Sequence, residues 1–357
     1  MPQNQPERGE AARAMHRLLA GSWVAQIIHA AAELGLADHF SEEAKDVASL
    51  ASATATHPPS LARLLRALAA VGVVHETDDR RYTLTSLGAT LRTDQPGSMR
   101  AWARFILGEE LDRVWGALPD AIRSGDTGFR HAFGTDLRSY IATHPDTATL
   151  YNAAQQSLTQ GLNAEIGAYY PFGNFGWIVD VGGGIGTLLL PILDRHPKMR
   201  GTIFELPQVA AQAHERIAAA GLATRCDAVD GNAFDTIPAG ADAYVMKSVL
   251  HGKTDDEAEA ILRNCRHAMP THAKLLIIER LLPERIDPDD ALARENLLMD
   301  INMMVAGGGR ERSEADYRAL LVKGTCASLA SSARLAHRPS SKQSPTEAID
   351  RTLRMTG

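Results

Sequence analysis

The sequence predicts an α/β fold whose C-terminal half is a doubly wound parallel sheet. The first indication is the stretch WIVDVGGGIG at residues 177–186, where a short apolar run passes directly into a glycine-rich turn. An apolar helical pattern resumes at 187–193, which completes a strand, a turn and a helix. The second indication is the alternation of strands and helices that follows. We expect strands at 177–181, 201–206, about 224–229, 241–250 and 273–282, and helices notably at 208–220 and 255–268.

The glycine turn indicates a nucleotide-binding βαβ unit. Its glycines at 182, 184 and 186 give G-x-G-x-G, but Thr187 stands where the dinucleotide fingerprint requires glycine or alanine. Glu205, near the end of the second strand, suits the two hydroxyls of a ribose. S-adenosylmethionine (SAM) and NAD both carry that ribose, but SAM has no pyrophosphate to be served by the third glycine. SAM is therefore favoured over NAD, and a glycine turn without a ligand remains an alternative.

The turn after the third strand is a further candidate part of this site. It reads Gly231-Asn232-Ala233-Phe234. In a SAM site, the Asn232 amide would meet the exocyclic amine of adenine, and Phe234 would form an apolar wall. A loop with one core phenylalanine explains the same residues equally well.

A histidine lies at the carboxyl end of the fourth strand, where the ligands of open α/β sheets bind. This is His251; Glu279 lies near the end of the fifth strand, and Glu311 follows a helix expected at 291–305. A carboxylate beside an imidazole fixes its tautomer and stabilises its cation. A phenol titrates at about 10, so methyl transfer to a phenol needs a base such as an imidazole. A lone histidine is more often structural, and the two glutamates favour the functional interpretation.

The spacing of His, Asp and Glu residues is not typical of a divalent-metal site, so we expect no metal and no magnesium-assisted mechanism. The chain has 357 residues, enough for two domains, and a formal net charge of −6, which offers no general attraction to nucleic acid or to anionic membranes. Its three cysteines are widely spaced, which indicates a reducing compartment. No signal peptide or long apolar run is apparent, so we expect a cytoplasmic protein without a membrane span.

The N-terminal region is expected to be a winged helix at 11–95. After a disordered start at 1–10, helical patterns run over 11–36, 41–53 and from 58 to 71, and a β-hairpin joins 73–75 to 81–84. A DNA-reading helix should be basic on its outer face, but the third helix carries only Arg63 and Arg66. The first helix is apolar enough to need a partner surface. A dimerisation module is therefore favoured over DNA binding.

Residues 96–170 are expected to form a helical linker that contributes to the substrate pocket. Phe105 and Trp115 are candidates for lining a pocket for a flat substrate. Aromatic side chains are more often plain core, and that interpretation is the more frequent one for each of them.

Together these motifs resemble the family of SAM-dependent small-molecule O-methyltransferases that includes plant caffeate methyltransferases and bacterial polyketide and phenazine methyltransferases. The resemblance runs from about residue 11 to 322. It rests on DVGGGIG at 180–186, FELP at 204–207, GNAF at 231–234, LHGKTDDEA at 250–258, ERLLP at 279–283 and GGRERSEADYRALL at 308–321.

The resemblance implies a dimerisation winged helix, a Rossmann-like methyltransferase domain at 171–326, SAM as cofactor, a small hydroxylated aromatic or polyketide-like acceptor, and a homodimer. It places His251 on the catalytic base, with Glu279 and Glu311 on the acids that bracket the base. The implied cofactor shell comprises Asp180, Gly182, Gly184, Gly186, Glu205, Leu206, Asn232, Ala233, Phe234 and Lys247. The implied acceptor pocket comprises Asn302 and Met303, joined by the aromatic candidates Trp115 and Phe105.

The chain departs from the family pattern beside the base. His251-Gly252-Lys253 stands where the family usually has His-Asp-Trp, and Asn232 replaces the usual aspartate. Two alternatives to O-methyl transfer therefore stay open. One is a SAM-binding enzyme with other chemistry, such as decarboxylation or hydroxylation, and the other is an impaired, non-catalytic dimer or a regulator.

The C-terminal tail at 327–357 is atypical. In the family, the helix matching 313–321 is followed by two strands that complete the sheet. Here the stretch after Val322 has one β-branched apolar residue, Ile349, and RPSSKQSP at 338–345 has a disordered composition. We expect a poorly ordered tail that leaves a strand edge exposed.

Overall fold

The computed structural model describes residues 5–95, 97–325 and 334–336. The chain divides into two compact units. The N-terminal unit comprises residues 1–113 and 140–159, and the sheet unit comprises residues 114–139 and 160–357. The division crosses the helices α7 (Glu109–Gly116), α10 (Leu137–Thr143) and α11 (Pro145–Tyr169).

The N-terminal unit contains the predicted helices and hairpin. Its helices pack around a core that includes Leu50, Leu65 and Leu68, and the two hairpin strands pair antiparallel with Val74 opposite Leu84. Its remaining elements are α1 (Gln5–Leu19), α2 (Gly21–Glu33), η1 (Leu36–His39), α3 (Val47–Ala53), α4 (Pro58–Ala70), β1 (Val74–Glu76), β2 (Tyr82–Leu84), α5 (Ser86–Ala89) and α6 (Arg100–Ile106).

Three boundaries in this unit differ from the sequence prediction. The helix expected at 11–36 is two helices, because the chain turns at Ala20 and the Ser22 hydroxyl donates to the Leu19 carbonyl. Residues 5–10 belong to α1 rather than to a disordered start. The helix expected at 41–53 begins only at Val47, where the Asp46 side chain caps it by accepting the Ser49 N–H at 2.7 Å.

The sheet unit is built on a parallel sheet, as predicted. The strands are β3 (Trp177–Val181), β4 (Arg200–Glu205), β5 (Cys226–Asp230), β6 (Ala243–Lys247), β7 (Lys274–Ile278) and β10 (Arg334–Ala336). Their order is β10-β7-β6-β3-β4-β5, and each neighbouring pair is parallel. The chain starts in the middle of the sheet and reverses its direction of growth between β5 and β6. The strand order therefore switches between β3 and β6, and in sheets of this kind ligands bind beyond the carboxyl ends of the strands at such a switch.

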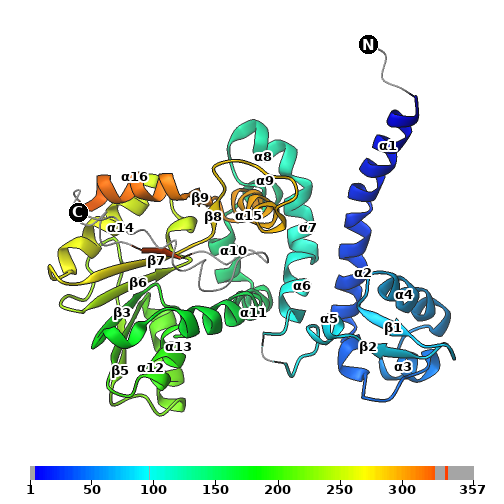
Figure 1. The fold of residues 1–357 in the computed structure, drawn as a ribbon, viewed down its shortest axis with the longest axis horizontal. Coiled ribbons are helices and arrows are strands. Elements are labelled where there is room, and N and C mark those ends of the chain that lie inside the picture. The colour runs from blue at the N-terminus through cyan, green and yellow to red at the C-terminus, as the bar shows by residue number, and fades with distance from the viewer. Residues whose placement is uncertain (1–4, 96, 326–333, 337–357) are drawn as a thin grey trace. The chain divides into compact units, whose positions relative to one another are not determined.

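Helices cover both faces of this sheet (Figure 1). Alternate residues of each strand face opposite cores because the side-chain period of a strand is two. Val179, Tyr244 and Ile277 pack with residues of α14 (Asp255–Ala268) and α16 (Glu314–Thr325). Their neighbours Ile178, Val245 and Leu276 pack with α12 (Leu189–Arg195) and α13 (Pro207–Ala219). Both sides of the strands are therefore buried, which explains why they read as continuous apolar runs.

The remaining elements of the sheet unit follow the predicted alternation, with shorter strands. They are α8 (Leu118–Ser124), α9 (Gly128–Phe133), η2 (Phe172–Asn174), η3 (Leu250–Gly252), β8 (Leu281–Leu282), α15 (Ala291–Asn302), η4 (Met303–Gly307) and β9 (Arg312–Ser313). The strand expected at 241–250 ends at Lys247, because Ser248 adopts a left-handed backbone conformation with φ +55°. The strand expected at 273–282 stops at Ile278, and β8 instead pairs with β9.

The tail expected at 327–357 lies mostly outside the described residues. Within it, Arg334–Ala336 form β10 and pair parallel with β7 from Leu276 to Ile278. Over these residues β7 is not the exposed edge that we expected. Within the described part of the chain, none of the helices combines the length and the hydropathy needed to cross a bilayer.

Candidate active site

The glycine turn after β3 has the backbone shape that its sequence predicts. Gly182, Gly184 and Gly186 have φ values of +71°, +57° and +81°, which side-chain-bearing residues rarely adopt. A Cβ atom on Gly183 would lie 2.6 Å from the Asp180 carboxyl carbon. The turn therefore needs glycine both for its conformation and for its close approach to a buried acid.

Glu205 connects the end of β4 to this turn. One carboxylate oxygen accepts the Gly184 N–H at 3.2 Å, and the other accepts the Leu206 N–H at 2.8 Å. Each carboxylate oxygen has two lone pairs, so both oxygens can still accept a hydrogen bond from a ligand hydroxyl. The predicted ribose acid thus lies beside the predicted glycine turn.

Asp180, which is buried, and Lys247, which is half-buried, influence each other electrostatically near the turn. Burial raises the pKa of Asp180 to about 7, with Lys247 opposing the rise and Glu205 adding to it. Burial also lowers the pKa of Lys247, and Asp180 counteracts this effect. One oxygen of Asp180 is buried without a hydrogen-bond partner among the described residues. Such an unpaired acceptor suits a cationic ligand group or a bridging water.

Apolar and amide groups follow β4 and β5, as expected for an adenine site. Leu206 and Phe234 are among the exposed large apolar side chains, and the Asn232 Oδ1 accepts the Phe234 N–H at 3.1 Å. Asn264 on α14 holds this turn by donating to the Ala233 and Phe234 carbonyls at 2.9 and 2.7 Å. The Lys253 ammonium lies 5.1 Å from the centre of the Phe234 ring, a cation–π contact.

Glu279 binds the backbone of the turn that carries His251. Its Oε1 accepts the N–H groups of Val249 at 2.9 Å, Leu250 at 2.8 Å and, more weakly, His251 at 3.4 Å. The carboxyl group is buried, and burial raises its pKa, while the nearby His251 and these N–H donors oppose the rise. Glu279 therefore holds the backbone of the His251 turn by hydrogen bonds.

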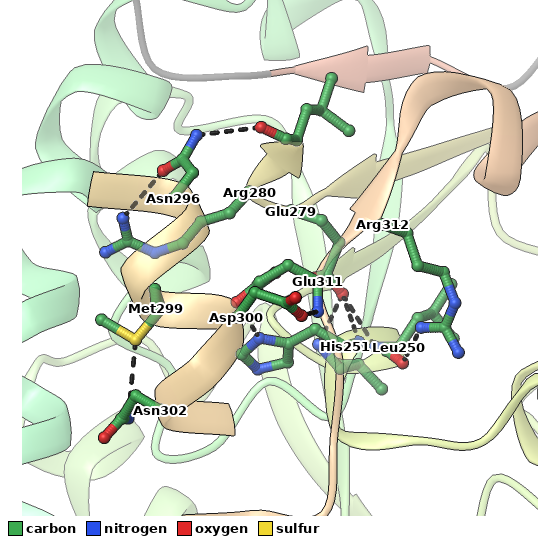
Figure 2. Close-up of polar contacts among 12 residues, drawn as sticks. Leu250, His251, Glu279, Arg280, Asn296, Met299, Asp300, Asn302, Glu311 and Arg312 are labelled. Carbon is green, nitrogen blue, oxygen red and sulfur yellow. Dashed lines mark hydrogen bonds and ion pairs between the residues drawn. The ribbon is translucent and has the colours of Figure 1, made fainter. Parts of the chain in front are cut away.

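Glu311 contacts the imidazole itself. Its Oε1 lies 3.0 Å from the His251 Nδ1, and Figure 2 shows this contact with Glu279 beside it. Burial by itself lowers the pKa of His251, but the Glu311 hydrogen bond and the charges of Glu279 and Glu311 outweigh it, so that the pKa is raised. A neutral imidazole that donates from Nδ1 to Glu311 keeps the lone pair on Nε2. The structure therefore brings together the histidine and both glutamates that the sequence singled out.

The spacing of these residues along the chain predicted no metal site, but the fold brings three possible ligand residues together. His251, Glu279 and Glu311 each offer a ligand atom, and these atoms lie within 4.8 Å of one another. The three residues are far apart in sequence, so chain spacing hides the cluster. The Glu279 Oε1, the Glu311 Oε1 and the His251 Nδ1 are engaged in hydrogen bonds, whereas the Glu279 Oε2 and the Glu311 Oε2 are buried without a hydrogen-bond partner among the described residues.

The residues predicted to line the acceptor pocket do not all lie in the same unit as His251. Asn302 is followed at once by the π-helical turn that begins with Met303, and the Asn302 Oδ1 is buried without a hydrogen-bond partner among the described residues. Trp115 lies on α7 within the sheet unit and is half-buried. Phe105 belongs to the N-terminal unit, where it is buried edge-on against Tyr151. This packing is that of a core residue.

The structure also shows residues near the base that sequence analysis missed. Asp300 on α15 accepts the Glu311 N–H at 2.7 Å, and Arg312 donates to the Leu250 carbonyl at 2.8 Å (Figure 2). Arg312 and Asn264 both bind backbone carbonyls of loops at the site. Residue spacing carries no signal for such contacts, and of these residues only Arg312 lies in one of the quoted motifs.

Comparison with known proteins gives consistent matches. Residues 115–325 match the O-methyltransferase domain, and residues 16–94 match the O-methyltransferase dimerisation domain. The chain is 38% identical over 304 residues to the phenazine O-methyltransferase PhzM of Lysobacter antibioticus, covering 85% of this chain and 87% of that protein. It is 33% identical over 290 residues to the aclacinomycin 10-hydroxylase RdmB of Streptomyces purpurascens, covering 80% and 76%.

The fold is also similar to a solved structure. The mitomycin 7-O-methyltransferase MmcR superposes with a TM-score of 0.79 at 36% identity, over 90% of this chain and 93% of that one. The similarity therefore extends over both units and not over the sheet unit alone.

The contact between His251 and Glu311 predicts a measurable titration. We expect an NMR titration of the imidazole to give a pKa above that of a free histidine, and Glu311→Gln to lower it, because the substitution removes the charge that stabilises the imidazolium. Protonation of His251 then stabilises the folded protein fully below the free-histidine pKa, and this contribution fades as pH rises through the folded-state pKa. Glu314→Gln, on the surface of α16, is the control. An identical pKa in Glu311→Gln and the parent would contradict the contact.

Proposed function

The chain belongs to the O-methyltransferase family, and from that premise we propose that His251 is the general base for methyl transfer from SAM to a hydroxyl of a small aromatic or polyketide-like acceptor. The observation that carries the proposal is the His251–Glu311 contact at the carboxyl end of β6. It leaves a half-buried, oriented imidazole with a free Nε2 at the carboxyl edge of the sheet.

The residues around the glycine turn fit SAM. The positive φ values at the turn allow close approach of the amino-acid end of the cofactor, and the unpaired oxygen of buried Asp180 suits its ammonium group. Glu205 would accept the ribose hydroxyls, and Lys247 keeps Asp180 partly charged. Leu206, Ala233 and Phe234 would bound the adenine, with Asn232 at its edge. These carboxylate acceptors and apolar side chains complement the positive charge, the ribose hydroxyls and the adenine of SAM. No pyrophosphate site is needed.

The protein's part in the reaction is alignment and proton removal. SAM supplies an activated methyl group when bound, so the chain needs no redox group or metal. His251 Nε2 takes the proton of the acceptor hydroxyl as its oxygen forms a bond to the methyl carbon. The carbon–sulfur bond breaks with its electron pair on sulfur, which yields S-adenosylhomocysteine, the methyl ether and an imidazolium. Glu311 stabilises that imidazolium by accepting from Nδ1.

The acceptor class is supported by the relatives and by the half-buried side chains near the base. The compared relatives include a phenazine and a mitomycin O-methyltransferase, which points to a flat, hydroxylated acceptor. Asn302, Met303 and Trp115 lie in the same unit as His251 and are our candidates for its pocket. Phe105 is the weakest candidate, because it is buried against Tyr151 in the N-terminal unit.

A second candidate function is SAM-dependent chemistry without methyl transfer. One observation favours it, namely that a relative at 33% identity is a hydroxylase. The retained pairing of His251 with Glu311 favours methyl transfer, because a base is needed for a phenol. Assay of a panel of phenols and hydroxyquinones for methyl ether and S-adenosylhomocysteine in equal amounts separates the two.

We further propose the division into a dimerisation module at 11–95, a linker at 96–170 and a catalytic domain at 171–326. Within the N-terminal unit, α1 and the start of α2 expose Met15, Leu18, Leu19 and Trp23. A run of exposed apolar side chains along two successive helices is a surface that favours a partner. The match of residues 16–94 to the dimerisation domain supports a second copy of this chain as that partner.

We expect Glu205→Ala to weaken SAM binding by about 1.5–3 kcal/mol, because a charge-assisted pair with the ribose hydroxyls is lost. Isothermal calorimetry measures the affinity. Glu215→Ala, an exposed glutamate on α13, should bind like the parent. Parent-like affinity in Glu205→Ala would remove Glu205 from the proposed site.

We expect His251→Ala to retain SAM affinity while turnover falls by about 10²–10⁴-fold, the range of general-base contributions. The matched control is His272→Ala, since His272 also pairs with a carboxylate, Asp242, but on the surface. Single-turnover assays with a responsive acceptor measure the loss. Equal rates in His251→Ala and the parent would show that proton removal does not depend on this residue.

We expect light scattering at micromolar concentration to give twice the 38.5 kDa monomer mass, and the double substitution Leu18→Glu, Leu19→Glu to give the monomer. Both side chains are exposed and apolar in the single chain, so charges placed there should block association. Ile286→Glu, at an exposed apolar position in the sheet unit, should leave the mass unchanged. A parent of monomer mass would refute the dimer.

A further inference from the structure

We propose that Arg312 is a positioning residue that holds the His251 turn in register with Glu311. This inference rests on the proposed function, in which His251 is the base. Arg312 does not contact the imidazole. It lies next to Glu311 in the chain and reaches the opposite side of the turn.

The guanidinium of Arg312 binds the turn on both sides of His251. Its Nη1 donates to the Leu250 carbonyl and its Nη2 to the Lys253 carbonyl, each at 2.8 Å. The Nε and Nη2 also donate to one oxygen of Asp255, at 3.0 and 2.7 Å. Asp255 begins α14, directly after the turn. One side chain thus connects the residues before and after the base to the next helix.

The segment that carries Arg312 makes two further contacts with the same turn. The Arg310 N–H donates to the His251 carbonyl at 2.8 Å, and Glu311 binds the imidazole. A Cβ atom on Gly309 would lie 2.4 Å from the His251 carbonyl oxygen, so glycine allows this close approach. Residues 309–312 therefore lie against the His251 turn like a short strand. Any displacement of this segment changes the distance between Glu311 and His251.

Arginine is required at this position by the geometry of its partners. Arg312 is completely buried, and its charge is compensated by Asp255, which is half exposed. A guanidinium presents several N–H donors in a rigid plane and can bind two carbonyls and a carboxylate at once. A lysine ammonium keeps the charge but is a compact point donor that cannot span both carbonyls. The substitution Arg312→Lys therefore keeps the positive charge but removes the simultaneous hydrogen bonds to the Leu250 and Lys253 carbonyls.

The consequence concerns chemistry more than cofactor binding. The glycine turn and Glu205 lie at the ends of β3 and β4, whereas Arg312 donates its hydrogen bonds to Leu250, Lys253 and Asp255. A shift of about 1 Å in a reacting group can cost about 10²-fold in rate. Loosening of the turn should also weaken the His251–Glu311 hydrogen bond, which lowers the pKa of the imidazole.

The test compares Arg312→Lys and Asp255→Asn with the surface control Arg318→Lys, in which an exposed α16 arginine paired with Glu314 is changed. We expect Arg312→Lys to lower kcat by about 10–100-fold, with the SAM dissociation constant changed less than about twofold. The NMR pKa of His251 and the acid limb of the kcat profile should both move to lower pH, towards the Glu311→Gln values. Asp255→Asn should shift both in the same direction by less, and Arg318→Lys should shift neither.

A purely structural role predicts a different pattern. It would lower the melting temperature of Arg312→Lys but leave kcat per folded molecule, the pH limb and the His251 pKa as in the parent, and this result would overturn the proposal. If Arg312→Lys does not fold, Asp255→Asn decides, and parent-like values there would overturn it as well. The NMR titration needs no acceptor, so it separates a failure of this proposal from a failure of the proposed reaction, which a fully active His251→Ala would reveal.

Discussion

Glu279 accepts the N–H groups of Val249 and Leu250 in the interior of the protein, and the position of the proposed base depends on this interaction. The turn after β6 leaves the sheet through a left-handed residue, Ser248, so its backbone groups lose their strand partners. Buried backbone groups must be paired. Here Glu279 accepts hydrogen bonds from the N–H groups, and Arg312 donates to the carbonyls of Leu250 and Lys253. Charged side chains therefore take the place of strand-to-strand hydrogen bonds.

The proposed site has two halves along the sheet, which differ in the groups that bind the backbone and the ligand. The half at β3, β4 and β5 is built mainly from glycine backbone, the acids Asp180 and Glu205, and apolar side chains, as suits a cofactor that is held close to the main chain. The half at β6 and β7 is built from charged side chains that hold one imidazole. The two halves meet where the strand order switches between β3 and β6.

Much of this arrangement was predictable from local sequence. WIVDVGGGIG predicted the strand and turn at their observed positions, because a buried parallel strand and a glycine turn each leave a local signature. The ends of strands were not predictable in the same way. No residue type around Ser248 predicts a left-handed backbone conformation, so the predicted strand extends beyond the observed end at Lys247. The approach of Glu279 and Glu311 to His251 was inferred from strand ends and a returning helix, and the observed contacts confirm that they lie together.

Contacts between side chains and backbone were the part that sequence could not supply. Arg312 and Asn264 act on carbonyl groups, which every residue possesses, so no pairing of residue types points to them. The metal-like geometry of His251 with its two glutamates was missed for a related reason, since its members come from three separate elements. The N-terminal helix pattern was likewise continuous in sequence, and a single hydroxyl at Ser22 accompanies its division into two helices.

The long sequence separation between His251 and Glu311 also affects the order in which parts of the site form during folding. The glycine turn and Glu205 meet within 21 residues of one another, whereas His251 meets Glu311 only 60 residues later. Contacts between distant residues form late, because more chain must be ordered before they can close. During synthesis, the cofactor half can therefore assemble before the segment at 309–312 has left the ribosome. A nascent or truncated chain that lacks residues 309–312 would have the cofactor residues in place, but its His251 would lack the contact with Glu311. The cofactor site and the proposed base would then be completed at different times.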